Sequence, residues 1–174
     1  MSPYARVIGY SQSFPKKFER VKNKIRRLTR YDVDIEHVGS TAIRGMRGKG
    51  VVDVLIGVRD WREGRSVVRS LEDEGFFRGS ANRGRVFLSL RKGMKDTHIH
   101  VVRKGTKQYD DFVMFRDYLK AHTEEWDDYV SLKKTAYRLD AEGYQKLKGR
   151  YVASILRKAR EEAAGSSEWA SGEP

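Results

Sequence analysis

The sequence predicts an α/β fold of the α+β type, in which helices flank a mixed β-sheet and a helical C-terminal half packs on it. Two observations support this prediction. Apolar segments short enough to be strands lie between residues 32 and 105, with helical segments before and among them, and after residue 106 the apolar spacing is helical throughout. The chain has 174 residues, about the length of one domain, so we expect a single domain over 1–163 and a disordered tail over 164–174.

The first predicted helix covers 14–30, and Pro15 suits its first turn. The face of this helix opposite its apolar residues is almost entirely cationic. Its apolar residues recur at helical spacing, which predicts that one face of the helix is buried. They are Phe14, Phe18, Val21, Ile25 and Leu28.

The strands are expected downstream of this helix. Residues 32–38 and 51–58 are predicted to be strands, the second of them buried on both faces. Residues 61–76 are predicted to form a helix between the second strand and a hairpin. The hairpin is expected over 84–93 and 96–105, around a short Gly-Met turn.

The C-terminal half contains three predicted helices. They cover 107–121, 123–140 and 143–163. In the last of them Tyr144 and Tyr151 lie on one apolar stripe, and we expect that stripe to face the rest of the protein.

Positive charge is in excess and unevenly distributed. The chain has 36 Lys and Arg against 24 Asp and Glu, and residues 1–30 contain nine basic side chains and one acidic one. Such an excess attracts polyanions, nucleic acid first and nucleotides or coenzymes second. The alternative is a solvated face that only keeps the protein soluble. The predicted nucleic-acid contacts on the first helix are Lys16, Lys17, Arg20, Lys24 and Arg27.

The composition also bears on localisation. The chain has no cysteine, which excludes disulfides and thiolate metal sites and favours a reducing compartment. No apolar run approaches the roughly 18 residues that span a bilayer. The start, "MSPYARVIGYSQSF", lacks the apolar core of a signal peptide. We therefore expect a cytoplasmic protein with no membrane partner, and the sequence does not predict its oligomeric state.

The main candidate site lies in "HVGSTAIRGMRGKGVVDVLIGV", residues 37–58. Asp53 is the one carboxylate of an apolar run, where an ionised Asp is costly unless a cation or hydrogen bonds hold it. Strand alternation places Asp53 opposite a fully apolar face. Gly39 permits a tight turn whose amides can approach an anion, and Ser40 adds a hydroxyl.

These residue types suit a metal-bound triphosphate. The amides and hydroxyls of the turn would take phosphate oxygens while Asp53 takes the divalent ion. The alternative is a glycine turn beside a structural, hydrogen-bonded Asp. The phosphate-binding candidates in this stretch are Gly39, Ser40, Thr41, Arg44 and Lys49.

Histidines form a second candidate cluster. His98 and His100 are two residues apart on a predicted strand, so both imidazoles leave the same face and are close enough to share a metal or an anion. His37 directly precedes the glycine turn. We expect these three histidines to lie near Asp53. A lone His-x-His pair is also compatible with a structural role.

The stretch "IEHVGSTAIRGMRGKGVVDVLIGV" resembles the signature of the GrpB family, in which His and Gly-Ser-Thr precede a turn with Gly and Lys and a strand with one Asp. The resemblance covers about residues 14 to 160. It continues in order through "HIHVV", "FRDYLKAH" (115–122), "YVSLKK" (129–134) and "YQKLKGRYV" (144–152).

This resemblance implies a nucleotidyltransferase-like fold of the polymerase-β-like superfamily. There a Gly-Ser turn holds nucleotide phosphates, and carboxylates on the next strand bind Mg²⁺. It implies that Asp53, Ser40 and Lys49 are catalytic. The implied metal ligands are Asp53, His98 and His100. The helical half would add a basic phosphate-binding wall from Arg116, Lys133 and Lys148.

One departure from the superfamily pattern matters. The position two residues after Asp53, where a second carboxylate is expected, is Leu55. Imidazole ligands in its place would favour Mn²⁺ or Zn²⁺ over Mg²⁺.

Three functions follow from these observations. The first is a metal-dependent nucleotidyltransferase that moves a nucleotidyl group from an NTP to an acceptor hydroxyl, with RNA, such as a tRNA 3′ end, as the acceptor. The second is a nucleic-acid-binding module of the same fold without catalysis, which Leu55 favours. The third is an enzyme acting on a small phosphorylated nucleotide or coenzyme.

Overall fold

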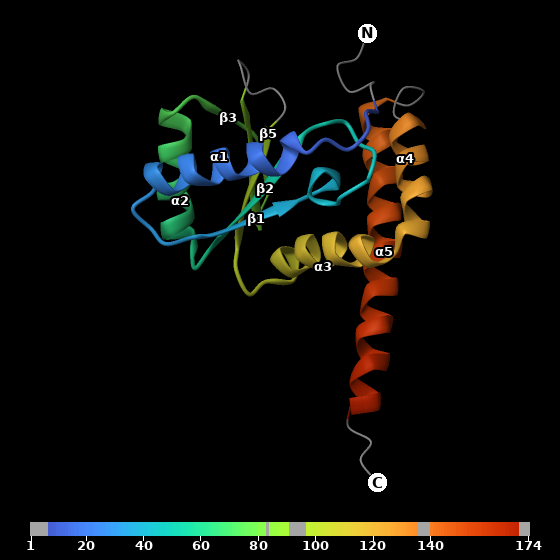
Figure 1. Ribbon diagram of the computed structural model, residues 1–174. Helices are drawn as coiled ribbons and strands as arrows, with labels where there is room; N and C mark the ends of the chain where they lie inside the picture. The colour runs from blue at the N-terminus through green and yellow to red at the C-terminus, as the bar shows by residue number, and fades with distance from the viewer. Residues whose placement is uncertain (1–6, 83, 91–96, 136–139, 171–174) are drawn as a thin grey trace.

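A five-stranded mixed sheet organises the structure (Figure 1). The computed structural model describes residues 7–82, 84–90, 97–135 and 140–170. The strand order is β1-β2-β5-β4-β3; β2 and β5 are parallel and the other neighbours antiparallel. The strands are β1 (Asp34–Val38), β2 (Val52–Val58), β3 (Phe76–Asn82), β4 (Arg85–Leu90) and β5 (Thr97–Arg103).

The first two helices cover one face of the sheet. They are α1 (Ser13–Leu28) and α2 (Trp61–Asp73). Their apolar stripes pack on alternate residues of β2, because successive side chains of a strand point to opposite faces. The residues that β2 contributes to this core are Val52, Val54, Ile56 and Val58.

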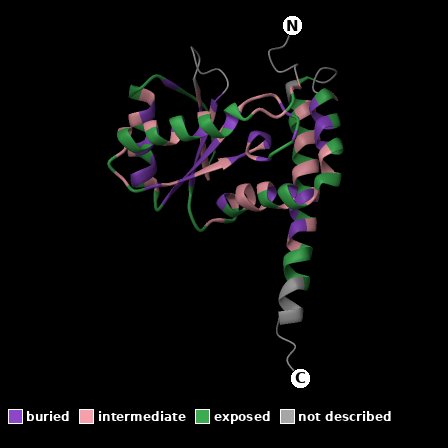
Figure 2. Cartoon of the chain, in the orientation of Figure 1, coloured by how far each residue is buried: buried purple, intermediate pink, exposed green. Residues whose placement is uncertain are grey.

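The remaining helices lie on the other face and beyond it. They are α3 (Lys107–Ala121), the short turns η1 (Ser40–Ala42) and η2 (Thr123–Glu125), α4 (Trp126–Thr135) and α5 (Ala141–Ala170). Tyr109 of α3 packs on Val38, Leu55 and Val102 of the sheet. A separate apolar cluster joins α3, α4 and α5 to the segment after η1 through Ile43. Figure 2 shows the buried residues along the strands and on the inward sides of the helices.

The predicted fold class is confirmed, and so is the hairpin. Residues 85–89 of β4 pair antiparallel with 98–102 of β5. The turn between them, 91–96, lies outside the described residues.

Some predicted boundaries are wrong. β3 was not predicted: it is an edge strand with a bulge, only Phe76 of it is buried, and its "GSAN" end lacks the alternation that signals a strand. The helix expected over 61–76 ends at Asp73. The helix expected over 123–140 is η2 followed by α4. α5 continues to Ala170, beyond the boundary expected at 163.

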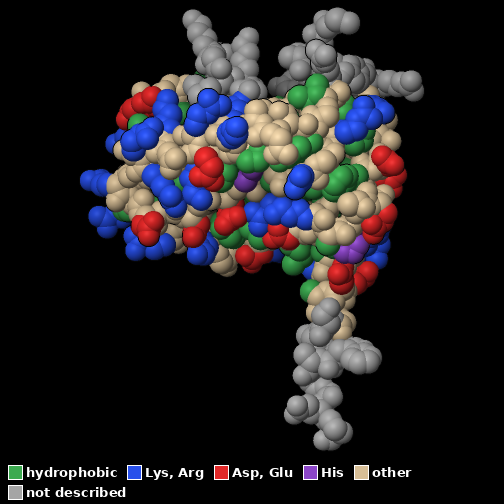
Figure 3. All heavy atoms as spheres, in the orientation of Figure 1, with side chains coloured by type: hydrophobic (Ala, Val, Ile, Leu, Met, Phe, Trp, Pro, Cys, Tyr) green, Lys and Arg blue, Asp and Glu red, His purple; other side chains and the backbone are tan. Residues whose placement is uncertain are grey.

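The predicted nucleic-acid-binding side chains lie on α1, across the sheet from the Asp53 side of β2. Figure 3 shows Lys and Arg spread over this face among acidic side chains. Lys24, for example, is ion-paired with Glu74 of the segment after α2 at 2.6 Å. Within the described residues, no helix has the length and apolar composition needed to cross a bilayer.

Candidate functional site

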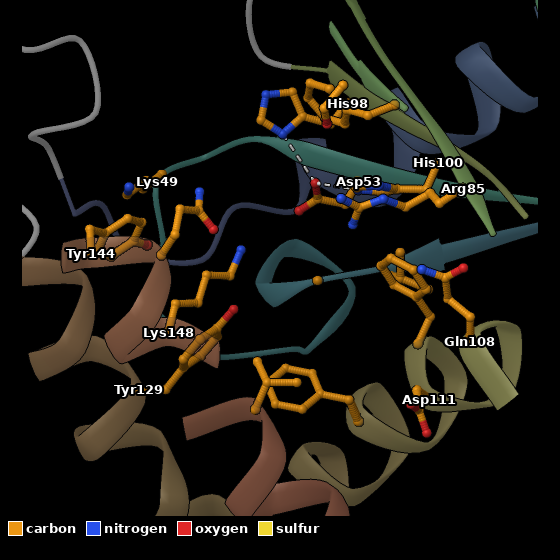
Figure 4. Close-up of a pocket in the computed structure, with 18 of the residues that line it drawn as sticks. Lys49, Asp53, Arg85, His98, His100, Gln108, Asp111, Tyr129, Tyr144 and Lys148 are labelled. Atoms are coloured by element: carbon orange, nitrogen blue, oxygen red, sulfur yellow. Dashed lines mark hydrogen bonds and ion pairs between the residues drawn. The ribbon is translucent and has the colours of Figure 1, made fainter. Parts of the chain in front are cut away.

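A cavity of about 770 Å³ opens between the second face of the sheet and the helical half. Strands β2, β4 and β5 form one wall, and helices α3, α4 and α5 form the other (Figure 4). Its polar lining includes Lys49, Asp53, Arg85, His98, His100, Gln108 and Lys148. Aromatic side chains complete it, among them Phe87, Phe112, Tyr129 and Tyr144.

Asp53 lies at the centre of the polar wall. In the parallel β2–β5 pair it is opposite His98, and His100 follows on the same face. His98 Nδ1 is 3.2 Å and His100 Nε2 is 3.5 Å from the same oxygen, Asp53 Oδ1. The predicted convergence of these three residues is therefore observed.

The protonation states follow from these contacts. Burial alone would raise the pKa of Asp53, but the hydrogen bonds it accepts from His100 and His98 outweigh burial and hold this pKa well below its usual range. Burial lowers the pKa of His100. Because an ionised carboxylate only accepts hydrogen bonds, each facing imidazole nitrogen carries the proton. Asp53 is thus an anion that two histidines orient.

The donor set does not form a site for a resident metal ion. Both imidazoles are directed at the carboxylate, and no group of three or more His, Asp or Glu among the described residues is arranged to hold a metal. Leu55, at the position of the missing second carboxylate, is fully buried against Val38 and Val102. One carboxylate is still enough for a Mg²⁺ that arrives on a triphosphate, since phosphate oxygens and waters supply its other ligands.

The glycine turn brings the backbone against this carboxylate. Gly39 has a φ of 72°, and a Cβ at this position would overlap Asp53 Oδ2. Gly48 is similarly constrained, because a Cβ there would overlap the Ser40 hydroxyl. Any side chain at position 39 would therefore displace Asp53.

Three lysines gather beside Asp53. They come from three elements: Lys49 from the segment before β2, Lys133 from α4 and Lys148 from α5. Lys133 is only 6% exposed, and its Nζ lies 3.9 Å from the centre of the Tyr129 ring. Lys49 Nζ lies 4.6 Å from the centre of the Tyr144 ring. No described carboxylate is within ion-pair distance of Lys133 or Lys148.

The electrostatics of these lysines reflect their crowding. Burial lowers the pKa of Lys133 to about 7; the Asp53 charge opposes this shift, and Lys148 and Lys49 add to it. Burial, and then the charge of Lys148, lower the pKa of Lys49. An anion bound among these ammonium groups would offset the repulsion between them and stabilise their charged forms.

The other predicted phosphate contacts are not among the residues that line the cavity. Ser40 is buried behind Gly48, near Lys133 Nζ. The Thr41 hydroxyl donates to Val51 O at 3.0 Å. Arg44 is exposed on the turn after η1. Arg116 donates to Glu36 and to His37 O, and so joins α3 to β1.

His37 does not join the cluster. It faces the α1 side of the sheet, where its ring stacks on Phe18 with 4.7 Å between ring centres. Its Nε2 contacts Thr41 Oγ1 at 3.0 Å. Burial lowers the pKa of His37 to about 4, so the ring is neutral at neutral pH. The three histidines were expected to converge near Asp53, but the ring of His37 points to the opposite face of the sheet. His37 and Val38 alternate along β1, and it is Val38 that points to the Asp53 side.

Sequence reasoning missed Arg85 and Gln108 of the cavity wall. Arg85 could have been found: in "RVFLSL" it shares a face with Phe87 and Ser89, and the predicted hairpin pairs Phe87 with His100. Gln108 carries no such signal, because its place depends on how α3 packs against the sheet.

The family model described as GrpB protein matches residues 5–158. This chain belongs to the GrpB family. The resemblance seen in its motifs is therefore confirmed.

Two relatives are similar to this chain over about two thirds of their own length or more. A UPF0157 protein of Halalkalibacterium halodurans is 29% identical over 158 residues, which are 88% of this chain and 81% of that protein. A UPF0157 protein of Pseudomonas aeruginosa is 32% identical over 88% of this chain and 66% of its own length.

Solved structures share the GrpB fold. The crystal structure of the conserved protein GrpB from Enterococcus faecalis matches with a TM-score of 0.78 and 21% identity, covering 91% of this chain and 99% of that one. The Cid1 poly(U) polymerase with MgGTP bound matches with a TM-score of 0.50 and 14% identity, over 70% of this chain and 40% of that chain. The chain thus has a nucleotidyltransferase-like fold and spans two fifths of the length of that polymerase.

Proposed function

We propose that this GrpB-family chain binds a nucleoside triphosphate with its Mg²⁺ in the cavity and transfers the nucleotidyl group to an acceptor hydroxyl. The observation that carries the proposal is that Lys49 and Lys148 line one cavity with an oriented, ionised Asp53, while the buried Lys133 interacts electrostatically with all three. Aromatic walls next to the lysines give the nucleoside apolar contact.

The proposed reaction breaks one bond and forms one. The acceptor oxygen bonds to the α-phosphorus, the bond from that phosphorus to the pyrophosphate oxygen breaks, and the acceptor proton passes to solvent. Lys49, Lys133 and Lys148 bind the β- and γ-phosphates and stabilise the charge that builds on the leaving pyrophosphate.

Asp53 serves as the carboxylate ligand of the ion that the triphosphate brings. Its low pKa makes it a poor proton acceptor, so we do not assign it as the general base. His98 and His100 are positioning residues that hold its carboxylate in one orientation. Because both imidazoles are engaged with the Asp53 carboxylate, the ion would have oxygen ligands only. Mg²⁺ therefore suits the site better than Mn²⁺ or Zn²⁺ does.

The proposed class of acceptor follows from the net positive charge of the chain. The excess of Lys and Arg favours RNA, such as a tRNA 3′ end, and Cid1, which shares the fold, is a poly(U) polymerase. The basic face of α1 lies across the sheet from the cavity. An RNA that uses both must pass around an edge of the sheet. A small phosphorylated acceptor needs only the cavity.

A second candidate is a nucleotide- or RNA-binding module without catalysis. The buried Leu55 in place of a second carboxylate favours it, because one carboxylate holds the ion less firmly than two.

The test combines binding with transfer. The four NTPs, each with Mg²⁺, are screened by thermal shift on wild type, on Asp53→Asn and on Asp127→Asn, an exposed carboxylate of α4. The best NTP, labelled on its α-phosphate, is then incubated with RNA and with sugar phosphates. Stabilisation and label transfer that are lost only in Asp53→Asn support the proposal. Stabilisation without any transfer favours a nucleotide-binding module. No stabilisation by any NTP, in a folded protein that still binds RNA, contradicts nucleotidyl transfer and favours the RNA-binding module.

A further inference from the structure

Arg85 lies in the cavity wall and has no counter-ion among the described residues. It begins β4, its Nε is buried, and no described atom accepts a hydrogen bond from that nitrogen. No described carboxylate is within ion-pair distance of it, and burial lowers the pKa of its guanidinium. A buried donor and charge left unsatisfied destabilise the free protein, and an anionic ligand would offset that cost.

Its surroundings leave that role open to a ligand. Gln108 and Ser89 line the same part of the cavity and can add hydrogen bonds. Asp111 also lines the cavity, but its carboxylate is paired with Lys107 at 2.8 Å and with Arg160. The nearest imidazole, His100, is neutral at neutral pH and bonded to Asp53.

Arg85 and the lysines lie on different sides of Asp53. Figure 4 shows Lys49 and Lys148 on one side, Arg85 and Gln108 on the other, and Asp53 between them. Nucleotidyl transfer requires the entering and leaving oxygens on opposite sides of the reacting phosphorus. If the pyrophosphate leaves from the lysine side, the acceptor enters from the Arg85 side.

We infer that Arg85, with Gln108, binds a phosphate group of the acceptor and thereby places the acceptor hydroxyl beside Asp53. This inference rests on the proposed function and deepens it. The two acceptor classes that the charge of the chain suggests, RNA and small phosphorylated nucleotides or coenzymes, both carry a phosphate ester near a hydroxyl. The planar guanidinium binds such an ester through two parallel hydrogen bonds. Phe87 and Phe112, whose ring centres are 5.4 and 4.9 Å from that of His100, give the sugar apolar walls.

The test titrates inorganic phosphate into the Lys49→Gln/Lys148→Gln protein, in which the lysine side is weakened. Arg85→Gln and, as the matched control, Arg103→Gln are each added to this background; Arg103 is exposed at the end of β5. Each variant is first checked for a cooperative thermal transition. We expect Arg85→Gln to weaken phosphate binding at least about tenfold, the loss of a hydrogen-bonded charge pair. Arg85→Lys should restore part of it, and Arg103→Gln should change it less than about twofold.

A second titration measures the Mg²⁺–NTP complex on proteins with intact lysines. We expect Arg85→Gln to leave its affinity within about twofold. Equal phosphate affinity in Arg85→Gln and Arg103→Gln, or no phosphate binding in the lysine-weakened protein, overturns the inference. A tenfold loss of NTP affinity in Arg85→Gln also overturns it, because Arg85 would then belong to the nucleotide. Failure of the proposed function is visible separately, as absence of NTP binding to wild type.

The source of the phosphate is then distinguished with ribose 5-phosphate and a short single-stranded RNA. Arg85-dependent binding of ribose 5-phosphate indicates a small acceptor. Arg85-dependent binding of the RNA alone indicates a nucleic-acid end. Arg85-independent binding of both contradicts the inference.

Discussion

The two faces of the sheet differ in how their charges are satisfied. On the α1–α2 face the apolar residues of β2 are packed, Lys24 is paired with Glu74, and the exposed Arg59 is paired with the buried Glu63. On the cavity face Lys133 and Arg85 are buried or half-buried, and no described carboxylate pairs with them. Cations of the first face are solvated or ion-paired, whereas we propose that the buried cations of the second face are neutralised by an anionic ligand. The contrast teaches that burial without a partner identifies this site better than the number of charges does.

The largest expected change in stability comes from truncating a buried residue of the α1–α2 face. Ile56→Ala removes a fully buried side chain from the α1–α2 core and should lower the free energy of unfolding by about 2–5 kcal/mol. Urea denaturation measures this loss. The folded Ile56→Ala variant should bind NTP with the affinity of wild type, because Ile56 points away from the cavity. A large loss of NTP affinity in the folded variant would show that the two faces are not independent.

A smaller loss is expected from Gly39→Ala. The positive φ and the overlap with Asp53 should cost about 1–3 kcal/mol of stability. The displaced carboxylate should also weaken Mg²⁺-dependent NTP binding, measured by calorimetry. Gly149→Ala on α5, where a Cβ meets no atom within 4 Å, is the control and should do neither. Wild-type NTP affinity in Gly39→Ala would contradict the role given to this turn.

Because of Lys133, we expect the stability of the protein and its NTP affinity on the cavity face to depend on pH. Its pKa is about 7 when folded, below the ordinary value of 10.5, so the unfolded chain binds more protons between these pH values. Stability should therefore rise with pH across this window, by at most about 1.4 kcal/mol per pH unit. NTP affinity should fall over the same window, as the ammonium beside Asp53, Lys49 and Lys148 loses its proton.

Lys133→Met isolates this contribution. Urea denaturation at a series of pH values should show the rise in wild type and a flatter profile in the variant. Lys134→Met, exposed on the same helix, is the control. Equal pH profiles in wild type and Lys133→Met would mean that Lys133 keeps its ordinary pKa.

The smallest effect is expected on the α1 surface. Lys16→Gln/Arg20→Gln/Arg27→Gln alters exposed side chains, so each change should shift stability by no more than about 0.5 kcal/mol. NTP affinity should not change. If single-stranded RNA contacts α1, the slope of log affinity against log salt should fall by about 2. An unchanged slope would restrict the RNA surface to the cavity side.

Much of the fold was predictable because its signals are local. The spacing of Phe14, Phe18 and Val21 predicted α1, and the apolar run around Asp53 predicted β2. β3 was not predicted, because an edge strand buries few side chains and need not alternate apolar and polar residues. The end of α5 escaped because small, polar residues, which predict a loose tail, also continue an established helix.

The candidate site was predictable only in part. The spacing of His98 and His100 predicted that both leave one face of a strand, and the parallel β2–β5 register places Asp53 opposite His98. The place of Lys133 depends on how α4 packs, and the orphaned guanidinium of Arg85 depends on which acids lie near it. These are tertiary facts that no spacing in the chain encodes.

The most direct measurement of the central claim is calorimetric titration of the Mg²⁺–NTP complex into wild type, Lys148→Gln and Lys146→Gln. Lys148 lines the cavity, and Lys146 is exposed two residues away on the same helix. We predict that Lys148→Gln weakens binding about tenfold or more and that Lys146→Gln leaves it within about twofold. Equal affinities of the two variants, or no binding to wild type, would contradict the assignment of this cavity to a triphosphate.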